Sequence, residues 1–396
     1  MAGDLVQHRS RPDPNDYLGA GKIEELRRAL ADSNANLIAC DDELLPRQER
    51  NLEQKTGVPV VDRTAIILDI FADHAASAEG KLQVELAQLE YNLARMRGLW
   101  THLERLGGGI GTRGPGESQI ETDRRLARDR ISQLKQRIER AERSRRLMRK
   151  RRERSEHPTI ALAGYTNAGK STLMNALTDA EAGVGERLFH TLDPTTRSFR
   201  HEGRTYLITD TVGFIRKLPH QLVEAFKATL EETVIADLIL HVVDASVPEA
   251  ARSEMVQAVD DVLEEIGAGP SPRVLVLNKI DLLDADTRRQ LEFRHPGAVV
   301  VSAETGEGMD ELRRRVQRIF SQDLEAIDLL VPYREGGVLS RLHDLAEGLE
   351  REETAEGVRV RARVPATVAE RLRPFSLNGR GPEPSRPEGD GGLEAS

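Results

Sequence analysis

A strand, a glycine turn and the start of a helix follow one another between residues 159 and 173, and this order constrains the fold most. The run contains the pattern G-x-x-x-x-G-K-S. In such a loop, backbone N–H groups surround a phosphate, the lysine reaches the terminal phosphates and the serine hydroxyl binds Mg²⁺. We therefore predict a nucleotide-binding loop that comprises Gly164, Tyr165, Thr166, Asn167, Ala168, Gly169, Lys170 and Ser171.

Residues 155–322 are predicted to form one α/β domain around this loop, because strand-like and helix-like segments alternate there. Such alternation is typical of a doubly wound, mainly parallel sheet that is covered by helices on both faces. Ligands of these sheets bind at the carboxyl ends of the strands. The predicted strands are 159–164, 205–208, 238–243, 273–277 and 299–301, and the predicted helices are 170–178, 221–233, 250–266 and 309–320.

Composition limits the class of protein. A chain of 396 residues with 38% hydrophobic residues is long enough for two to four domains. One cysteine excludes an internal disulfide framework, and no apolar run is long enough for a membrane span. We therefore expect a soluble, cytoplasmic monomer with no integral membrane association. The net charge of −9 argues against nonspecific binding of nucleic acid over the whole surface, and no DNA partner is expected.

An N-terminal α/β subdomain is predicted for residues 1–80. Apolar spacing indicates helices at 22–31 and 42–54, a strand at 36–40 and further apolar segments at 59–61 and 65–71. A glycine turn, 17–22, leads into the first helix. This turn is either a tight structural turn or a second phosphate-binding loop.

Residues 81–154 are predicted to form a helical hairpin. Apolar residues recur in alternating steps of four and three, which is typical of a coiled coil. Plain helices that pack on a neighbouring domain are the alternative. The seam residues are Leu82, Leu86, Leu89, Leu93, Met96, Trp100 and Leu103 in the first helix, and Ile131, Leu134, Ile138, Ala141, Arg145 and Met148 in the second, where the seam turns basic.

The tip of the hairpin, residues 107–116, contains six glycines and one cation, Arg113. Because glycine has no side chain, the backbone of such a loop can approach a ligand closely. It is either a disordered turn or a probe for a distant partner, and its length favours the probe. The basic run 137–154 is either a solvated helix face or a contact for nucleic-acid phosphates.

The chain after residue 322 is predicted to form a small α/β C-terminal domain, 323–376, and a disordered tail, 377–396. A strand at 327–331, a helix at 338–349 and a strand at 358–364 are expected. The tail is rich in Gly, Pro and Glu, which is typical of disorder.

Two clusters downstream of the phosphate loop are suited to a metal ion and a γ-phosphate. The Thr191 hydroxyl can bind Mg²⁺, and Asp210 can hold the same ion through water. The Gly213 N–H can contact the γ-phosphate. The clusters are Phe189, His190, Thr191, Leu192 and Asp193, and then Asp210, Thr211, Val212 and Gly213.

Two further clusters are suited to guanine. The Asp281 carboxylate can accept both N1–H and the exocyclic amino group, which adenine does not present there, and such sites discriminate by ~10⁴-fold or more. The Ala303 N–H can donate to guanine O6. The clusters are Asn278, Lys279, Ile280 and Asp281, and then Ser302, Ala303 and Glu304. Five clusters in this order predict a GTPase that binds GTP, GDP and Mg²⁺, with catalytic Lys170, Thr191 and Gly213 and with Ser171 and Thr191 as metal ligands.

The residue that would position the attacking water is missing. Many GTPases place a glutamine directly after the glycine that corresponds to Gly213, but this chain has Phe214. We therefore expect slow intrinsic hydrolysis. Asn167 matches in position an asparagine with which related GTPases hold K⁺, or it only hydrogen-bonds its own loop.

With these motifs, the chain resembles the HflX family of ribosome-associated GTPases over residues 15–375. Besides the GTPase clusters, the similar segments are 17–22, 41–53, 107–116, 189–197 and 210–219. The resemblance implies that the protein binds the 50S ribosomal subunit and its rRNA, that the N-terminal region enters the peptidyl-transferase region, and that stalled ribosomes are split or rescued. The N-terminus of this chain departs from the family pattern, because it offers little room for a first strand before Tyr17.

Two other functions are compatible with the motifs. The GTPase could act in ribosome assembly or together with an RNA-modifying enzyme, although the chain has no cluster of residues suited to modification chemistry. Alternatively, the N-terminal region could be an RNA-binding module in which GTP is only a structural switch. Co-sedimentation with intact ribosomes or with isolated subunits would separate these functions.

Overall fold

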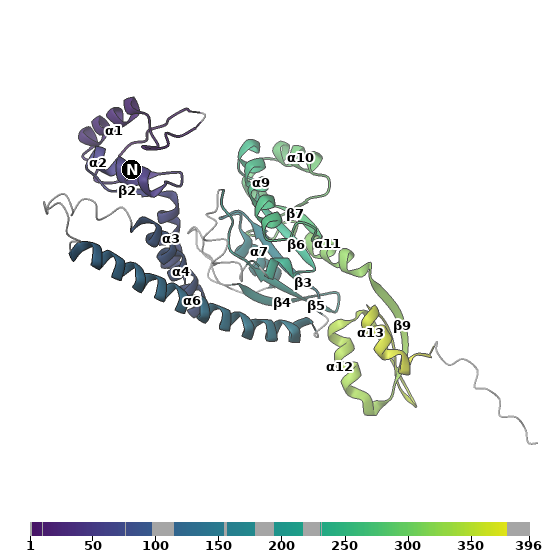
Figure 1. Ribbon diagram of the computed structural model, residues 1–396. Coiled ribbons are helices and arrows are strands. Elements are labelled where there is room, and N and C mark those ends of the chain that lie inside the picture. Colours follow the sequence, from purple (N-terminus) through teal and green to yellow (C-terminus); the bar gives the residue numbers. More distant parts are fainter. Residues whose placement is uncertain are drawn as a thin grey trace, which may run out of the picture.

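The computed structural model describes residues 2–9, 11–75, 77–96, 115–153, 157–178, 194–216, 230 and 232–377. Figure 1 shows the N-terminal elements at one end, a large sheet in the middle and a smaller sheet at the other end. The large sheet has six strands and the smaller one has three. The long helix α6 (Pro115–Glu153) extends from the N-terminal end toward the central sheet. None of the helices in these ranges is both long and apolar enough to cross a membrane.

The central sheet confirms the predicted mainly parallel α/β fold. Its strand order is β4-β5-β3-β6-β7-β8, and every neighbouring pair is parallel except β4 and β5. The antiparallel edge strand β4 was not predicted, because its sequence is polar and only Phe199 is buried in it. The strands are β3 (Thr159–Gly164), β4 (Thr195–His201), β5 (Arg204–Asp210), β6 (Leu238–Asp244), β7 (Arg273–Asn278) and β8 (Val299–Val300).

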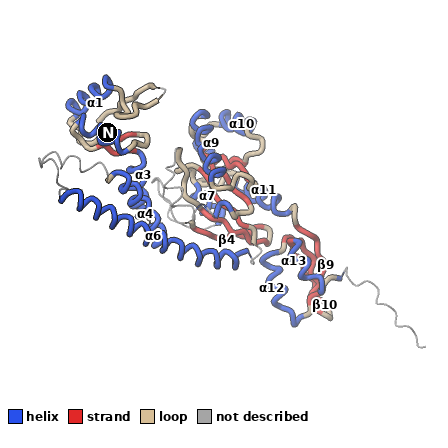
Figure 2. Tube along the Cα trace, viewed as in Figure 1, coloured by secondary structure: helices blue, strands red, loops and turns tan. Residues whose placement is uncertain are grey.

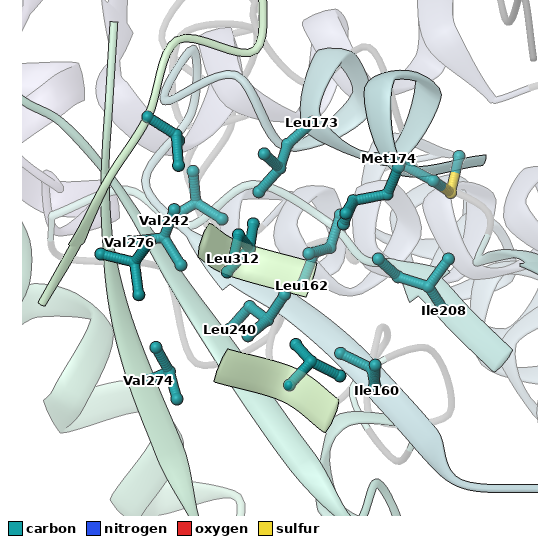
Figure 3. Close-up of a cluster of buried hydrophobic side chains, with 14 of the residues drawn as sticks. Ile160, Leu162, Leu173, Met174, Ile208, Leu240, Val242, Val274, Val276 and Leu312 are labelled. Carbon is teal, nitrogen blue, oxygen red and sulfur yellow. The ribbon is translucent and has the colours of Figure 1, made fainter. Parts of the chain in front are cut away.

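Helices cover both faces of the central sheet. On one face, α7 (Lys170–Thr178) and α11 (Met309–Ser321) pack on the strands through Leu173, Met174 and Leu312, as Figure 3 shows. On the other face lie α9 (Glu249–Glu265) and α10 (Ala285–Arg294). Helix α10 was not predicted, because its sequence is polar and Leu291 is its one buried residue. Most of the helix expected at 221–233 lies outside the described residues.

The N-terminal region is the predicted small α/β unit, with a parallel pair of strands. No strand precedes the first helix in the part of the N-terminus that the structure describes. The segment 65–71, whose structure was left open, is helical. The elements are α1 (Ala20–Ser33), β1 (Ile38–Cys40), α2 (Pro46–Thr56), β2 (Val60–Asp62) and α3 (Arg63–His74).

Side chains from the preceding segment of the chain lie against the glycine turn before α1. The Gly19 N–H donates to Oε1 of Gln7 at 2.8 Å. The Arg9 guanidinium lies 3.2 Å from the point where a Cβ of residue 19 would be. These contacts favour the structural turn over a second phosphate-binding loop.

The helical hairpin consists of α4 (Ala78–Arg95) and α6, as predicted. Leu86, Leu134 and Ile138 form its buried seam, with Leu82, Leu89 and Ile131 packed beside them. Ion pairs flank the seam, between Arg130 and Glu85 and between Lys135 and Glu90. Residues 97–114, which include Trp100, Leu103 and most of the tip loop, lie outside the described residues, as do the side chains of most of the basic run beyond residue 143.

The C-terminal domain is α/β, as predicted, and has an antiparallel sheet in the order β10-β11-β9. Residues 347–349, which were expected to end a helix, lie in β10 instead. The sheet has its own core, to which α12 and α13 contribute. The elements are β9 (Leu324–Val331), α12 (Gly336–Leu345), β10 (Glu347–Thr354), β11 (Gly357–Pro365) and α13 (Ala366–Leu372). Residues 378–396, the predicted tail, lie outside the described residues.

The N-terminal helices share a core with the central domain. Val212 and Ile215, which follow β5, are buried with Phe71 of α3 and with Val84 and Tyr91 of α4. Tyr165, in the loop after β3, packs against the same cluster. Figure 2 shows α3 and α4 beside α6, next to the central domain. The apolar residues of the 210–215 segment therefore join the two regions.

His241 is a buried base in the middle of the central sheet, on β6. Desolvation lowers the pKa of its imidazole to about 4, and the positive charges of Arg273 and Lys170 act in the same direction. Asp260 of α9 lies 3.8 Å from its Nδ1. The imidazole is therefore neutral in the folded protein at neutral pH.

The neutral imidazole predicts an acid-sensitive fold. A base whose folded-state pKa is depressed stabilises the fold above its unfolded pKa, and this stability is lost as the pH falls from 6.5 toward 4. The loss should reach about 3 kcal/mol. We expect urea unfolding to show a smaller decrease over this pH range for His241→Leu than for the wild type. Equal pH slopes would contradict the assignment.

Candidate functional site

The predicted phosphate loop lies between the end of β3 at Gly164 and the start of α7 at Lys170. A Cβ on Gly164 would lie 2.2 Å from the carbonyl oxygen of Val242 on the neighbouring strand. Gly169 has φ +92°, in the left-handed region, and its missing Cβ leaves room for the Asn278 amide. Glycine is therefore required at both ends of the loop for steric reasons.

Lys170 is held inside this loop. Its Nζ donates to the carbonyl oxygens of Gly164 and Tyr165, at 3.0 Å each. Burial lowers the pKa of the ammonium to about 8, although the negative charge of Asp210 opposes the shift. A buried ammonium that hydrogen-bonds neutral carbonyls, in a loop of backbone N–H groups, is suited to an anionic ligand.

The Asn278 side chain connects the phosphate loop to a second loop. Its Nδ2 donates to the Ala168 carbonyl at 2.9 Å, and its Oδ1 accepts from the Ala303 N–H at 3.0 Å. Asn278 is at the end of β7 and is 2% exposed. The predicted clusters 164–171, 278–281 and 302–304 therefore meet at one edge of the sheet, as the parallel topology requires.

The predicted base-binding residues differ in their surroundings. Asp281 is exposed and Ser302 is buried, while Ile280 packs in the core beneath α10. The Ala303 N–H, which we expected to donate to guanine O6, donates to Asn278 instead. To bind a base, the Ala303 N–H would have to release the Asn278 oxygen or donate to both acceptors at once.

Lys279 has a partner that the sequence analysis missed. Its backbone is left-handed, with φ 66°, and its Nζ lies 2.7 Å from Oδ2 of Asp244. Asp244 ends β6, and its other oxygen accepts from the hydroxyl of Ser246 at 2.6 Å. The sequence contains one signal for this Lys279–Asp244 pair, which is an acidic residue at the carboxyl end of a strand next to the 278–281 cluster.

Ser171 and Asp210 form the part of the predicted metal site that the structure describes. The Ser171 hydroxyl donates to Oδ2 of Asp210 at 2.6 Å, and Asp210 is 1% exposed. A hydroxyl beside a buried carboxylate is the oxygen donor set that Mg²⁺ prefers. Residues 189–193, which include Phe189, His190, Thr191, Leu192 and Asp193, lie outside the described residues. Glu304 is described and is exposed.

Gly213 and Phe214 lie directly against the phosphate loop. A Cβ on Gly213 would be 2.7 Å from Cγ2 of Thr166 and 3.2 Å from the Lys170 Nζ. Phe214 is 1% exposed and packs with Ile239 and Val259 beneath α9. Its backbone carbonyl accepts from the Thr166 N–H at 2.8 Å. The ring therefore belongs to the core and does not face the phosphate loop.

The sequence matches three family profiles. Residues 1–72 match "GTP-binding GTPase N-terminal", residues 74–152 match "GTP-binding GTPase Middle Region" and residues 159–279 match "50S ribosome-binding GTPase". A solved GTP-binding protein from Sulfolobus solfataricus in complex with GDP is 27% identical, with a TM-score of 0.42, over 79% of this chain and 89% of that chain.

Curated relatives named "GTPase HflX" cover nearly the whole chain. The protein of Caldanaerobacter subterraneus subsp. tengcongensis is 45% identical, over 96% of this chain and 87% of its own length. The protein of Escherichia coli K12 is 46% identical, over 93% of this chain and 87% of its own length. With the loops around Asn278 arranged as described, this similarity shows that the chain belongs to the HflX family of GTPases.

Proposed function

We propose that this GTPase binds GTP with Mg²⁺ at the edge of the sheet where the loops around Asn278 meet, and hydrolyses it while bound to the 50S subunit. The observation that carries the nucleotide site is the double hydrogen bond of Asn278, which connects the phosphate loop to the base-binding loops. A ribosome-directed GTPase acts in the cytoplasm, which is the location we propose.

The loop and Lys170 have defined roles in this mechanism. The N–H groups of residues 167–171 bind the phosphates, and the Lys170 ammonium moves from the carbonyl oxygens to the β- and γ-phosphates. Ser171, Asp210 and Thr191 would hold Mg²⁺, which neutralises charge on the phosphates when it is bound. The Gly213 N–H would contact the γ-phosphate, while Asp281 and Ala303 would bind guanine.

Water positioning needs a group other than residue 214. Phe214 is fixed in the core beneath α9 and has no hydrogen-bonding group. Asn167 is exposed at the loop, with φ 62°, and is the residue that would hold K⁺. Slow intrinsic hydrolysis that is accelerated on the ribosome follows from this arrangement.

The ribosomal role rests on the family and on the hairpin. The profile that covers the phosphate loop is named for binding the 50S ribosome. The hairpin helix α6, with 39 residues, is about 58 Å long at the α-helical rise. We propose that its glycine-rich end contacts ribosomal RNA in the peptidyl-transferase region and that the protein splits or rescues stalled ribosomes as a monomer.

The buried Lys170 predicts proton uptake on nucleotide binding. Because its pKa in the free protein is about 8, the ammonium is partly deprotonated at about pH 8.5, and bound phosphate should raise the pKa again. Calorimetric GDP titrations in buffers of different ionisation enthalpy should show uptake of a large fraction of a proton at about pH 8.5 but not at about pH 7. Lys170→Arg, which stays charged throughout, is the control and should show no such increase.

Guanine specificity should depend on Asp281. Asp281→Asn replaces two acceptor oxygens with one acceptor and one donor. This change should weaken GTP binding roughly 100-fold and favour xanthine nucleotides. The measurement is titration of the variant with GDP and xanthosine diphosphate, and an unchanged GDP affinity would show that the base pocket is assigned wrongly.

The tip loop should be needed for the ribosome and not for the nucleotide. Replacement of residues 107–116 by a short turn should leave GDP affinity and the thermal midpoint unchanged, since six of its ten residues are glycines, which have no side chain to bury in a core. It should abolish the acceleration of GTP hydrolysis by 50S subunits. A shortened protein that responds fully to 50S subunits would exclude a role of the loop in ribosome binding.

A further inference from the structure

Arg288 of α10 reaches both loops that are proposed to hold the guanine base. Its Nε donates to the carbonyl oxygen of Ile280 at 2.8 Å. Its Nη1 lies 2.7 Å from Oε1 of Glu307. The Ile280 carbonyl belongs to the peptide bond that precedes Asp281, and Glu307 lies in the loop that begins at Ser302.

The helix that carries Arg288 is fixed in place. Leu291, one turn further along α10, is 3% exposed and packs in a core with Val243, Leu277 and Ile280. The helix begins at an N-cap, Asp284, whose carboxylate accepts two backbone N–H groups. Residues three apart lie on the same face of a helix. The buried contact of Leu291 therefore aims Arg288 at the 278–281 loop.

Both loops have conformations that need support. Before Asp281, the chain passes through the left-handed Lys279 and a single 3-10 turn, η1 (Ile280–Leu282). The second loop closes on itself, because the Ser302 N–H donates to the Glu307 carbonyl at 2.9 Å. The Glu307 carboxylate is thus attached to the same closed loop as Ala303. One guanidinium holds a carbonyl of the first loop and the carboxylate of the second.

We propose that Arg288 is a positioning residue for guanine recognition, which sets the relative placement of Asp281 and Ala303. This inference rests on the proposed function of those two residues. A planar guanidinium offers several donors in fixed directions and so can bind two acceptors in a defined geometry, whereas a lysine ammonium is a compact point charge whose three donors rotate freely. Because the ion pair is half-exposed, its effect should come from loop geometry more than from charge attraction.

The inference predicts a change in base selectivity. Guanine offers two donors to Asp281, while hypoxanthine lacks the exocyclic amino group and offers one. Displacement of Asp281 should therefore weaken the binding of GDP more than that of inosine diphosphate. For Arg288→Ala we expect the ratio of the two affinities to fall about 3- to 10-fold, which is the range for one hydrogen bond. In GTP hydrolysis, the loss should appear in KM rather than in kcat.

The experiment is calorimetric titration of the full-length protein with GDP and with inosine diphosphate. Arg289→Ala is the matched control, since Arg289 is the next residue of α10, is 75% exposed and pairs only with Asp286 of the same helix among the ion pairs described. Arg288→Lys and Glu307→Gln are milder variants that should lower the same ratio if Arg288→Ala does not fold. A control that lowers the ratio as much as Arg288→Ala would overturn the inference.

Two further outcomes separate the inference from the proposed function. If Arg288→Ala weakens both nucleotides equally, or neither, Arg288 does not position the base-binding residues and the inference is wrong. Asp281→Asn is measured alongside. If Asp281→Asn weakens GDP as expected and Arg288→Ala leaves the ratio unchanged, only the inference fails. If Asp281→Asn leaves GDP binding unchanged, the base pocket itself is wrong and the inference fails with it.

Discussion

The arrangement of the chain depends on the burial of Val212 and Ile215 against α3 and α4. These residues flank Gly213, which we propose to contact the γ-phosphate, and they are 5% and 7% exposed. A polar contact supplements them, because the Arg63 guanidinium donates to the Arg216 carbonyl at 2.9 Å. The nucleotide site and the base of the hairpin therefore share one core. Separating them would expose apolar surface to water, at about 25 cal/mol per Å².

The C-terminal domain is attached in a different way. It has a core of its own, and hydrogen bonds attach it to the central domain. Gln317 and Ser321 of α11 both donate to the Glu347 carboxylate, at 2.5 and 2.6 Å, and Arg200 of β4 donates to the His343 carbonyl at 2.6 Å. Polar interfaces of this kind are typical of domains that can move relative to one another. The N-terminal region is thus joined to the central domain by a shared apolar core, whereas hydrogen bonds attach the C-terminal domain to it.

Within the central domain, the carboxyl edge of the sheet brings the site together. Asn278 connects two loops, Asp244 holds the Lys279 ammonium, and Arg288 connects the base-binding loops from the outside. These contacts come from residues that are up to 110 positions apart in the chain. Glycine at positions 164 and 169 makes these contacts possible, because the missing Cβ atoms leave room for Val242 and Asn278.

The sequence by itself determined the class of fold, the phosphate loop, the order of the nucleotide clusters and the helical hairpin. Each of these follows from local periodicity or from residue types at fixed spacing, which act over a few neighbouring positions. The sequence did not reveal β4 and α10, because their polar residues give little amphipathic patterning, nor α13, because its seven residues are too few to show a periodic pattern. Only the tertiary structure decided that Val212 and Ile215 belong to the N-terminal core, that Phe214 is buried and that the Ala303 N–H has an internal acceptor. The physical reason is that burial and hydrogen-bond partners depend on which surfaces meet, and no local pattern contains this information.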